Sequence, residues 1–101
     1  MRMTIAQFEV TFLRTDQGGR ASLVNLDKGG YSPHLVVNNG PYLGVRFLPS
    51  DLGLFVPGVP TPVEVELLYE ATVDYSQLET GGSIAIVEGS RVVGWAEPRP
   101  R

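Results

Sequence analysis

The residue in this sequence best able to act as a general base near neutral pH is its single histidine, His34. Hydrolysis by a serine nucleophile needs such a base beside an activated hydroxyl, and none of the six serines lies in a Gly-x-Ser-x-Gly elbow. A small hydrolase that uses His34 in a concave pocket is therefore one hypothesis. The missing nucleophile motif favours the alternative, in which His34 is exposed or hydrogen-bonded locally at the start of a strand, and we expect no enzyme activity.

Metal and nucleotide chemistry have equally little support. With no cysteine and one histidine, the chain has too few nitrogen and sulfur ligands for zinc, and no acidic loop has the spacing of a calcium site. The paired glycines are Gly18-Gly19, Gly29-Gly30 and Gly81-Gly82. They match neither a dinucleotide fingerprint nor a phosphate loop, and Lys28 is the only lysine. Glu64 and Glu66 share a predicted strand face without any motif that indicates a cleft. We expect no cofactor, metal or nucleotide.

Length and composition indicate one domain. A chain of 101 residues with 43% hydrophobic content can bury a core without disulfides. We expect a single barrel over residues 1–97 and a loose tail over 98–101. Neither a secretory signal at Met1–Glu9 nor a membrane-spanning apolar run is recognisable, so we expect a soluble, cytoplasmic protein.

The charged residues are unevenly distributed. Residues 1–50 hold five basic and three acidic side chains, whereas residues 51–101 hold three basic and eight acidic ones. The net charge of −3 argues against a general binder of polyanions, since phosphate contacts depend on clustered Lys and Arg.

Two segments alternate between apolar and polar residues with the two-residue period of a half-buried strand, Ile5–Arg14 and Val63–Glu70. The side chains expected to point inward are Phe8, Val10, Phe12, Val63, Val65, Leu67 and Tyr69. The glutamates between them are expected on a solvated face that discourages edge pairing.

Two hairpins are also expected. The strands of the first are Pro33–Val37 and Tyr42–Leu48, and those of the second are Ser83–Glu88 and Arg91–Ala96. Asn38–Pro41 tolerates the backbone of a reversal, and Gly89-Ser90 suits a type II′ turn that places Glu88 opposite Arg91. Asp74–Glu79 is expected to form at most a single helical turn.

Gly53–Pro62 is too rich in proline for a helix interior or a central strand and is expected to be a structured loop. Its apolar residues Leu54, Phe55 and Val56 either form an exposed patch or plug one barrel end. Several short strands with turns between them predict an all-β barrel or sandwich.

Several motifs occur in an order that resembles the carboxy-terminal β-barrel, the third domain, of translation elongation factor Tu. They are Phe8-Glu9-Val10, Gly18-Gly19-Arg20, Gly30-Tyr31 with Pro33, Val56-Pro57-Gly58, the strand Val63–Leu68 and the hairpin Ile84–Gly94. The resemblance covers nearly the whole chain. It implies a closed six-stranded antiparallel β-barrel like the elongation factor Tu C-terminal domain, here as a stand-alone protein.

In that family the barrel has no catalytic residues, helps to hold the T stem of aminoacyl-tRNA and contacts the exchange factor. This chain departs from the family at three places. Ala21-Ser22-Leu23 replaces a His-Thr-Pro type sequence, Ser32 replaces an arginine, and Val87 replaces a basic residue before Glu-Gly. These losses of polar or basic groups weaken the expectation of phosphate binding.

We therefore expect a non-catalytic binding module, first of all a protein-binding accessory or regulatory protein of bacterial translation, or a decoy or immunity-type protein. The candidate binding residues are Arg20, Tyr31, His34, Arg46 and Arg91. The alternative is a tRNA- or RNA-binding module in which Arg20, Lys28, Arg46 and Arg91 form a basic stripe.

Each candidate also has a structural interpretation. Arg20 and Arg91 either line a binding face or hold their own turns by bonding carbonyls or a carboxylate, and we favour the second role. Tyr31, Tyr42 and Trp95 either form an aromatic contact surface or pack in the core and barrel ends, and we again favour the second.

Overall fold

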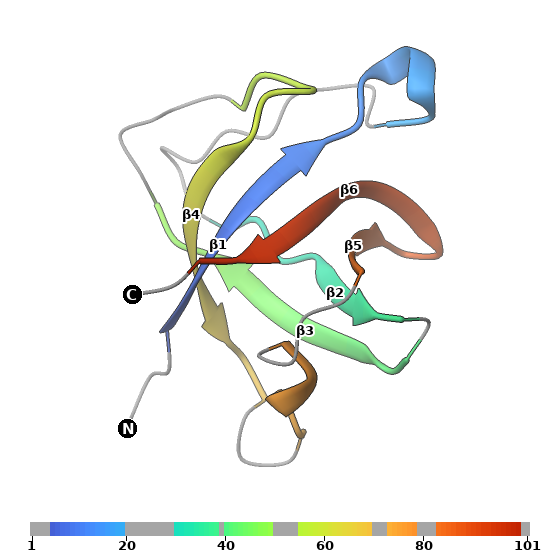
Figure 1. Cartoon of the computed structure of the whole chain (residues 1–101). Helices are drawn as coiled ribbons and strands as arrows, with labels where there is room; N and C mark the ends of the chain where they lie inside the picture. The colour runs from blue at the N-terminus through green and yellow to red at the C-terminus, as the bar shows by residue number, and fades with distance from the viewer. Residues whose placement is uncertain are drawn as a thin grey trace.

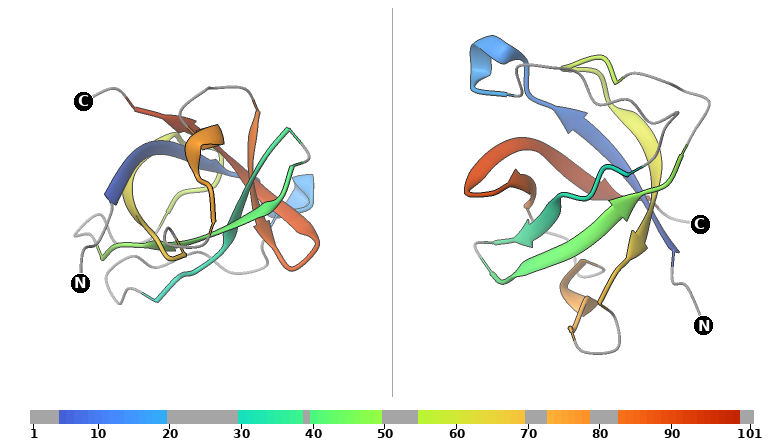
Figure 2. Two further views of the ribbon diagram at one scale, coloured as in Figure 1. Left: turned by 90° about the horizontal axis from the view of Figure 1, so that it is seen from below. Right: turned by 180° about the vertical axis from the view of Figure 1, so that it is seen from behind.

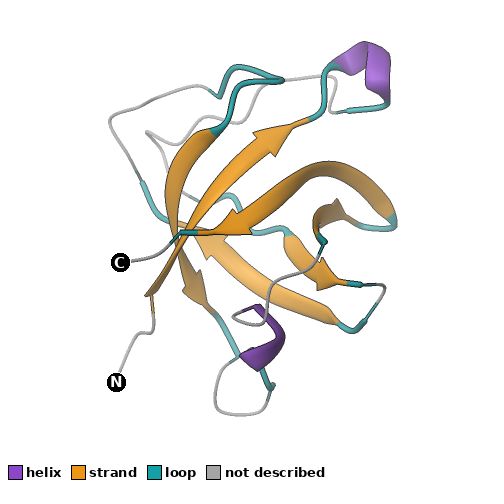
Figure 3. Cartoon of the chain, viewed as in Figure 1, coloured by secondary structure: helices purple, strands orange, loops and turns teal. Residues whose placement is uncertain are grey.

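Strands are the main regular elements of the described residues, as a computed structural model shows (Figure 1). The structure describes residues 5–19, 30–38, 40–49, 55–69, 73–78 and 83–99. The strands in these ranges are β1 (Ile5–Phe12), β2 (His34–Val37), β3 (Tyr42–Phe47), β4 (Thr61–Leu67), β5 (Ile84–Glu88) and β6 (Arg91–Pro98). Two 3₁₀ turns, η1 (Thr15–Gln17) and η2 (Ser76–Leu78), interrupt the loops. No α-helix occurs in the described part of the chain, and the two segments coloured as helix in Figure 3 are η1 and η2.

The strands close into a barrel in the order β1-β4-β3-β2-β5-β6, and every neighbouring pair is antiparallel. Both expected hairpins are present as the β2–β3 and β5–β6 pairs. Figure 2 shows the strands wrapping around a common axis. The prediction of an all-β, closed six-stranded antiparallel barrel is therefore confirmed. Closure matters for function because it leaves no strand edge to which another chain could add.

The barrel interior follows the predicted alternation along β1 and β4. Phe8, Val10 and Phe12 are buried, as are Val63 and Val65 on the neighbouring strand. These residues belong to one core cluster that also receives side chains from β2, β3, β5 and β6. A two-residue period is thus sufficient to say which side of these two strands faces the core.

The predicted inward orientation fails at Tyr69, which is 54% exposed. The reason is that β4 ends at Leu67 and the chain turns at residues 68 and 69, so the strand period no longer applies. β4 also begins earlier than expected and includes Pro62, opposite Glu9 of β1.

The position of Pro62 has a backbone explanation. The Leu48 N–H donates to the Glu64 carbonyl at 2.9 Å, so even-numbered residues of β4 direct their backbone polar groups toward β3. The register between β3 and β4 ends at the Phe47–Val65 pair. A backbone N–H at position 62 would point toward β3, beyond the last residue pair of β3 and β4. A proline, which has no N–H, is therefore tolerated at this position.

Side chains from two loops close the barrel ends. Phe55 is buried at one end, with its ring centroid 4.7 Å from that of Phe12 and 6.2 Å from that of Phe47. At the other end Tyr75 and Leu78, beside η2, are buried in the same core cluster. The expected single helical turn is therefore present. In Figure 3 the two 3₁₀ turns lie at opposite ends of the barrel.

The proline-rich loop combines both alternatives considered for it. Phe55 plugs the barrel, whereas Val56 and Val59 are 59% and 48% exposed. Leu54 lies outside the described residues. Of the expected tail, Pro98 belongs to β6 and the Arg99 N–H donates to the Gln7 carbonyl at 2.9 Å, so these two residues are held by the barrel. Residues 100 and 101 lie outside the described residues.

The β5–β6 hairpin contains the irregularity that matters most for the surface. Gly89 has φ +63° and Ser90 does not have a positive φ, which is the pattern expected of a type II′ turn. Beyond the turn, Val87 is opposite Val92 but Ile86 is opposite Gly94, so Val93 is an extra residue on β6. This bulge changes which residues of β6 face outward.

Candidate functional site

Arg91, the first residue of β6, holds the turn that follows β1. Its Nε and Nη2 donate to the Gly18 carbonyl at 3.0 Å and 2.9 Å, and Nη2 also donates to the Gly19 carbonyl. Gly19 itself has no room for a side chain, since an added Cβ would lie 2.2 Å from the Leu13 carbonyl oxygen. The guanidinium therefore links a tight glycine turn to the β5–β6 hairpin, which is the turn-holding role. Arg20 lies outside the described residues.

Arg46 is engaged by its cross-strand neighbour. It lies directly opposite Glu66 in the β3–β4 register, and its Nη2 forms an ion pair with Glu66 Oε1. The Arg46 side chain is 46% exposed, so solvent screens this pair. The predicted basic stripe thus has two members, Arg46 and Arg91, that bond to the protein itself and two, Arg20 and Lys28, outside the described residues.

Tyr31 packs at a barrel end. Its ring centroid lies 5.1 Å from that of Phe47 in an edge-on arrangement and 6.0 Å from that of Phe12. Its hydroxyl donates to Glu88 Oε2 at 2.5 Å. Tyr31 is therefore held by the core on one side and by the β5–β6 hairpin on the other.

His34 lies at the start of β2 and is half-buried. Its ring centroid is 5.5 Å from that of Tyr42, two residues along the facing strand from its partner Gly44. No hydrogen bond or ion pair joins the imidazole to another residue in the described ranges. No group of three or more His, Cys, Asp or Glu able to hold a metal ion occurs among the described residues either.

The predicted site residues are thus distributed over the barrel and not gathered into one site. Described contacts join none of Tyr31, His34, Arg46 and Arg91 to one another. The one contact between residues that the sequence singled out is that of His34 with Tyr42. A different surface, on the outside of the barrel, gathers more side chains.

The outside of β2 and β5 is apolar. Val36, Ala85 and Val87 are 8%, 9% and 3% exposed and form a cluster of their own, separate from the main core. Leu35 and Ile86, between them in sequence, point into the barrel. Both faces of these two strands are therefore apolar, which is unusual for an antiparallel sheet with one solvated face.

Register extends this cluster into a row across four strands. Tyr42 of β3 is opposite Val36 of β2, Val36 is opposite Ala85 of β5, and Ala85 is opposite Trp95 of β6. We call these four residues the outer row. Its two aromatic ends are exposed, Tyr42 by 51% and Trp95 by 45%. Residues opposite each other on adjacent strands are direct neighbours, so the row is continuous.

Two further exposed apolar side chains flank the outer row. Val92, 36% exposed, faces outward beside Val87 because the bulge at Val93 shifts the phase of β6. Tyr69 lies against Gly44 of β3, where an added Cβ would approach the tyrosine ring to 2.6 Å. The interpretation that Tyr42 and Trp95 pack in the core or a barrel end is therefore wrong, whereas it holds for Tyr31.

A pair of carboxylates adjoins the outer row. Trp95 is opposite Thr11 of β1, and two residues further along the same strands Glu97 is opposite Glu9. Both glutamates are exposed. Neither has an ion pair or hydrogen bond with any residue in the described ranges. Like charges directly opposite each other repel, so this pair opposes the stability of the barrel.

The sequence contained a signal for this face that the strand analysis did not use. Leu35-Val36-Val37 and Ile84-Ala85-Ile86-Val87 are unbroken apolar runs, which are typical of strands covered on both faces. Tyr42 and Trp95 lie on other strands, so only the strand register shows that they are neighbours of these apolar runs.

Neither a protein-family model nor a curated protein matches this chain. In the described part of the chain, no helix has the length and apolar character needed to cross a membrane.

Proposed function

We propose that this barrel is a non-catalytic protein-binding module whose partner docks on the outer row. The exposure of Tyr42 and Trp95 at the two ends of an already desolvated apolar strip is the observation that carries the proposal. Trp and Tyr are the residues that most often dominate binding energy at interfaces, because each buries a large area at small entropic cost.

The closed topology supports docking through side chains. A barrel without a free edge cannot accept an added strand, so the usual backbone-mediated mode of peptide capture is not available to it. A partner must instead contact the exposed side chains. Among the described residues, most of the large apolar ones lie on or beside the outer row: Tyr42, Trp95, Val92 and Tyr69.

The kinship with the third domain of elongation factor Tu is part of the same proposal. A closed six-stranded barrel is what the resemblance implied, and the barrel of that family works by binding. We place the partner among proteins of bacterial translation in the cytoplasm, in an accessory, regulatory or decoy role.

Affinity capture from a bacterial lysate with matched variants tests the proposal. The test variant is Tyr42→Ala/Trp95→Ala, and the control is Val56→Ala/Val59→Ala, which removes equally exposed apolar side chains from the loop before β4. Far-UV circular dichroism first establishes that both are folded. We expect at least one translation protein to be retained by the wild type and the control and to fall at least tenfold with the test variant.

Two results would contradict this function. One is an identical set of retained proteins for the test variant and the control. The other is salt-sensitive retention of tRNA that both variants leave unchanged, which would favour the RNA-binding alternative.

A further inference from the structure

We infer that the outer row and the carboxylates of Glu9 and Glu97 together bind a short polypeptide segment that presents apolar side chains next to Arg or Lys. This inference rests on the proposed function and specifies the chemistry of the partner. It depends on the continuity of the apolar and acidic surfaces, on the absence of polar partners for the two carboxylates among the described residues and on the size of the combined patch.

Continuity follows from the register. Trp95 and Thr11 are a cross-strand pair, and Glu97 and Glu9 form the next outward-facing pair along the same two strands. Two residues along a strand span about 7 Å. A ligand that covers the Trp95 ring therefore reaches both carboxylates with one long side chain. Arg and Lys are the side chains with that reach and the opposite charge.

The carboxylates are available to such a side chain. Within the described residues neither glutamate has a polar partner. Arg99, which follows β6 and lies two residues from Glu97, forms no ion pair with either carboxylate, and its backbone N–H donates to the Gln7 carbonyl. A bound guanidinium would replace the repulsion between the two carboxylates by attraction. Trp95 adds an aromatic face next to this position, and aromatic faces attract cations.

The size of the patch indicates a segment and not a second copy of the chain. The outer row crosses three strand spacings, about 14 Å in all, and its accessible parts are the Tyr42 and Trp95 rings at the two ends, since Val36 and Ala85 are already buried. That length matches about ten residues of helix or four to five residues of extended chain. A stable dimer buries about 800 Å² on each partner, well above what a four-residue row and two carboxylates provide. A second copy would also bring further acidic residues to an already acidic edge.

Charge likewise disfavours nucleic acid at this surface. A phosphate placed on the outer row would lie next to two carboxylates that form no ion pair with any residue in the described ranges. Arg91, the basic residue next to the β5–β6 turn, is already bonded to the Gly18 and Gly19 carbonyls. An apolar segment with a positive charge is therefore the complementary ligand.

Fluorescence anisotropy with labelled synthetic peptides tests the inference. The probes are two twelve-residue peptides with the same leucine content, one with arginine and one with glutamate at the polar positions, and a single-stranded RNA oligonucleotide. The test variant is Glu9→Gln/Glu97→Gln. The control is Asp16→Asn/Asp74→Asn, which removes the same charge from exposed carboxylates elsewhere. The protein's single tryptophan, Trp95, reports whether the peptide covers the outer row.

We expect the leucine–arginine peptide to bind the wild type and the control alike and to shift Trp95 emission to shorter wavelength. Its affinity should be at least fivefold lower for the test variant and should fall with added salt. The leucine–glutamate peptide should bind at least tenfold more weakly to the wild type.

The inference is overturned if the wild type does not bind the leucine–arginine peptide, if the test variant and the control bind it equally, or if the RNA binds more tightly. These failures are distinguishable from failure of the proposed function. If Tyr42→Ala/Trp95→Ala still loses its captured protein while Glu9→Gln/Glu97→Gln keeps it, the docking surface stands and only the basic chemistry of the partner is wrong.

Discussion

Replacing Arg91 by alanine should destabilise the barrel by about 2 kcal/mol, which tests whether this residue holds a turn or serves a partner. A hydrogen bond from a charged donor contributes about 1.5 to 3 kcal/mol when buried and much less when solvent reaches it. The bond to the Gly19 carbonyl is partly buried and contributes most of this stability, whereas the bonds to Gly18 are exposed and add little.

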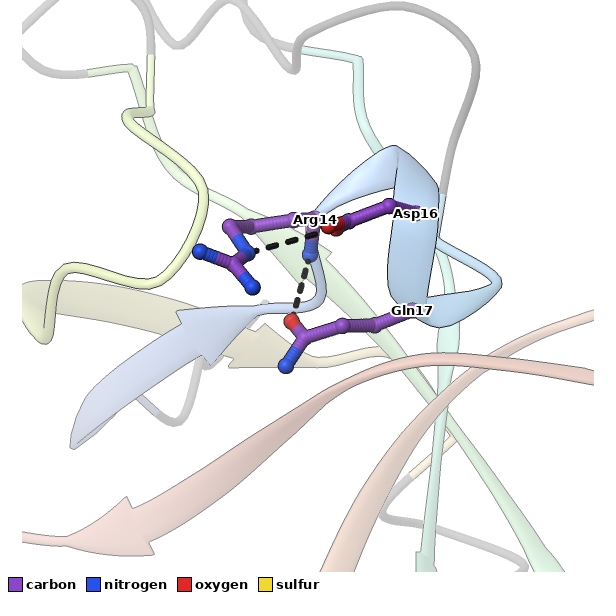
Figure 4. A network of polar contacts seen from close by, with 3 residues as sticks. All are labelled: Arg14, Asp16 and Gln17. Atoms are coloured by element: carbon purple, nitrogen blue, oxygen red, sulfur yellow. Dashed lines mark hydrogen bonds and ion pairs between the residues drawn. The ribbon is translucent and has the colours of Figure 1, made fainter.

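A matched control exists in the same turn. Arg14 Nε lies 3.3 Å from Asp16 Oδ1, and both side chains are largely exposed, whereas the backbone N–H of Arg14 donates to Gln17 Oε1 at 3.0 Å (Figure 4). Arg14→Ala removes the ion pair and leaves the backbone contact in place. Exposed pairs of this kind contribute a few tenths of a kcal/mol, so we expect almost no change in stability.

The assay is thermal unfolding followed by far-UV circular dichroism. For a domain of this size about 2 kcal/mol corresponds to a fall of about 8 to 16 °C in Tm. Arg91→Lys should recover less than half of the loss, because an ammonium group does not reproduce the planar fork that reaches two carbonyls. Amide exchange at Gly18 and Gly19 should accelerate in Arg91→Ala.

A Tm for Arg91→Ala within about 4 °C of that for Arg14→Ala would refute the reasoning. It would mean that the hydrogen bonds to the Gly18 and Gly19 carbonyls contribute no net stability, and Arg91 would again be a candidate for partner binding.

Three further predictions concern other parts of the barrel. Glu97→Gln should raise the free energy of unfolding in urea by a few tenths to about 1 kcal/mol, because it removes the repulsion with Glu9, and a gain no larger than that of Glu64→Gln would contradict this. Gly94→Ala should lower Tm by several degrees or more, since the added Cβ would lie 2.7 Å from the Thr11 carbonyl oxygen. An unchanged Tm would show that β1 can move away from β6 at this position without loss of stability. The pKa of Asp74 is lowered by hydrogen bonds from the backbone N–H and then the hydroxyl of Ser76, so this carboxylate stabilises the fold above its unfolded pKa and less as the pH falls below about 4. The stability difference between wild type and Asp74→Ala, measured by urea unfolding, should therefore shrink between pH 7 and pH 2, and a constant difference would contradict it.

Much of the fold was predictable from local patterns. Phe8, Val10 and Phe12 point inward because a strand buries every second residue, and Gly89-Ser90 turns the chain because its first residue tolerates a positive φ. These features depend on neighbours in sequence. The candidate binding residues remain predictions: Tyr31, Arg46 and Arg91 bond within the protein and do not form one cluster. The outer row was not predictable from local patterns, because its members come from four different strands.

What the sequence determined by itself is that the chain forms short, alternating strands around one apolar core and has no recognisable catalytic motif. Only the tertiary structure decided which strands are neighbours, because the period of two specifies a face but not a partner. The outer row needs the β3-β2-β5-β6 order to join Tyr42 to Trp95. It also needs the bulge at Val93, which lets Val92 and Trp95 both face outward although they are three residues apart.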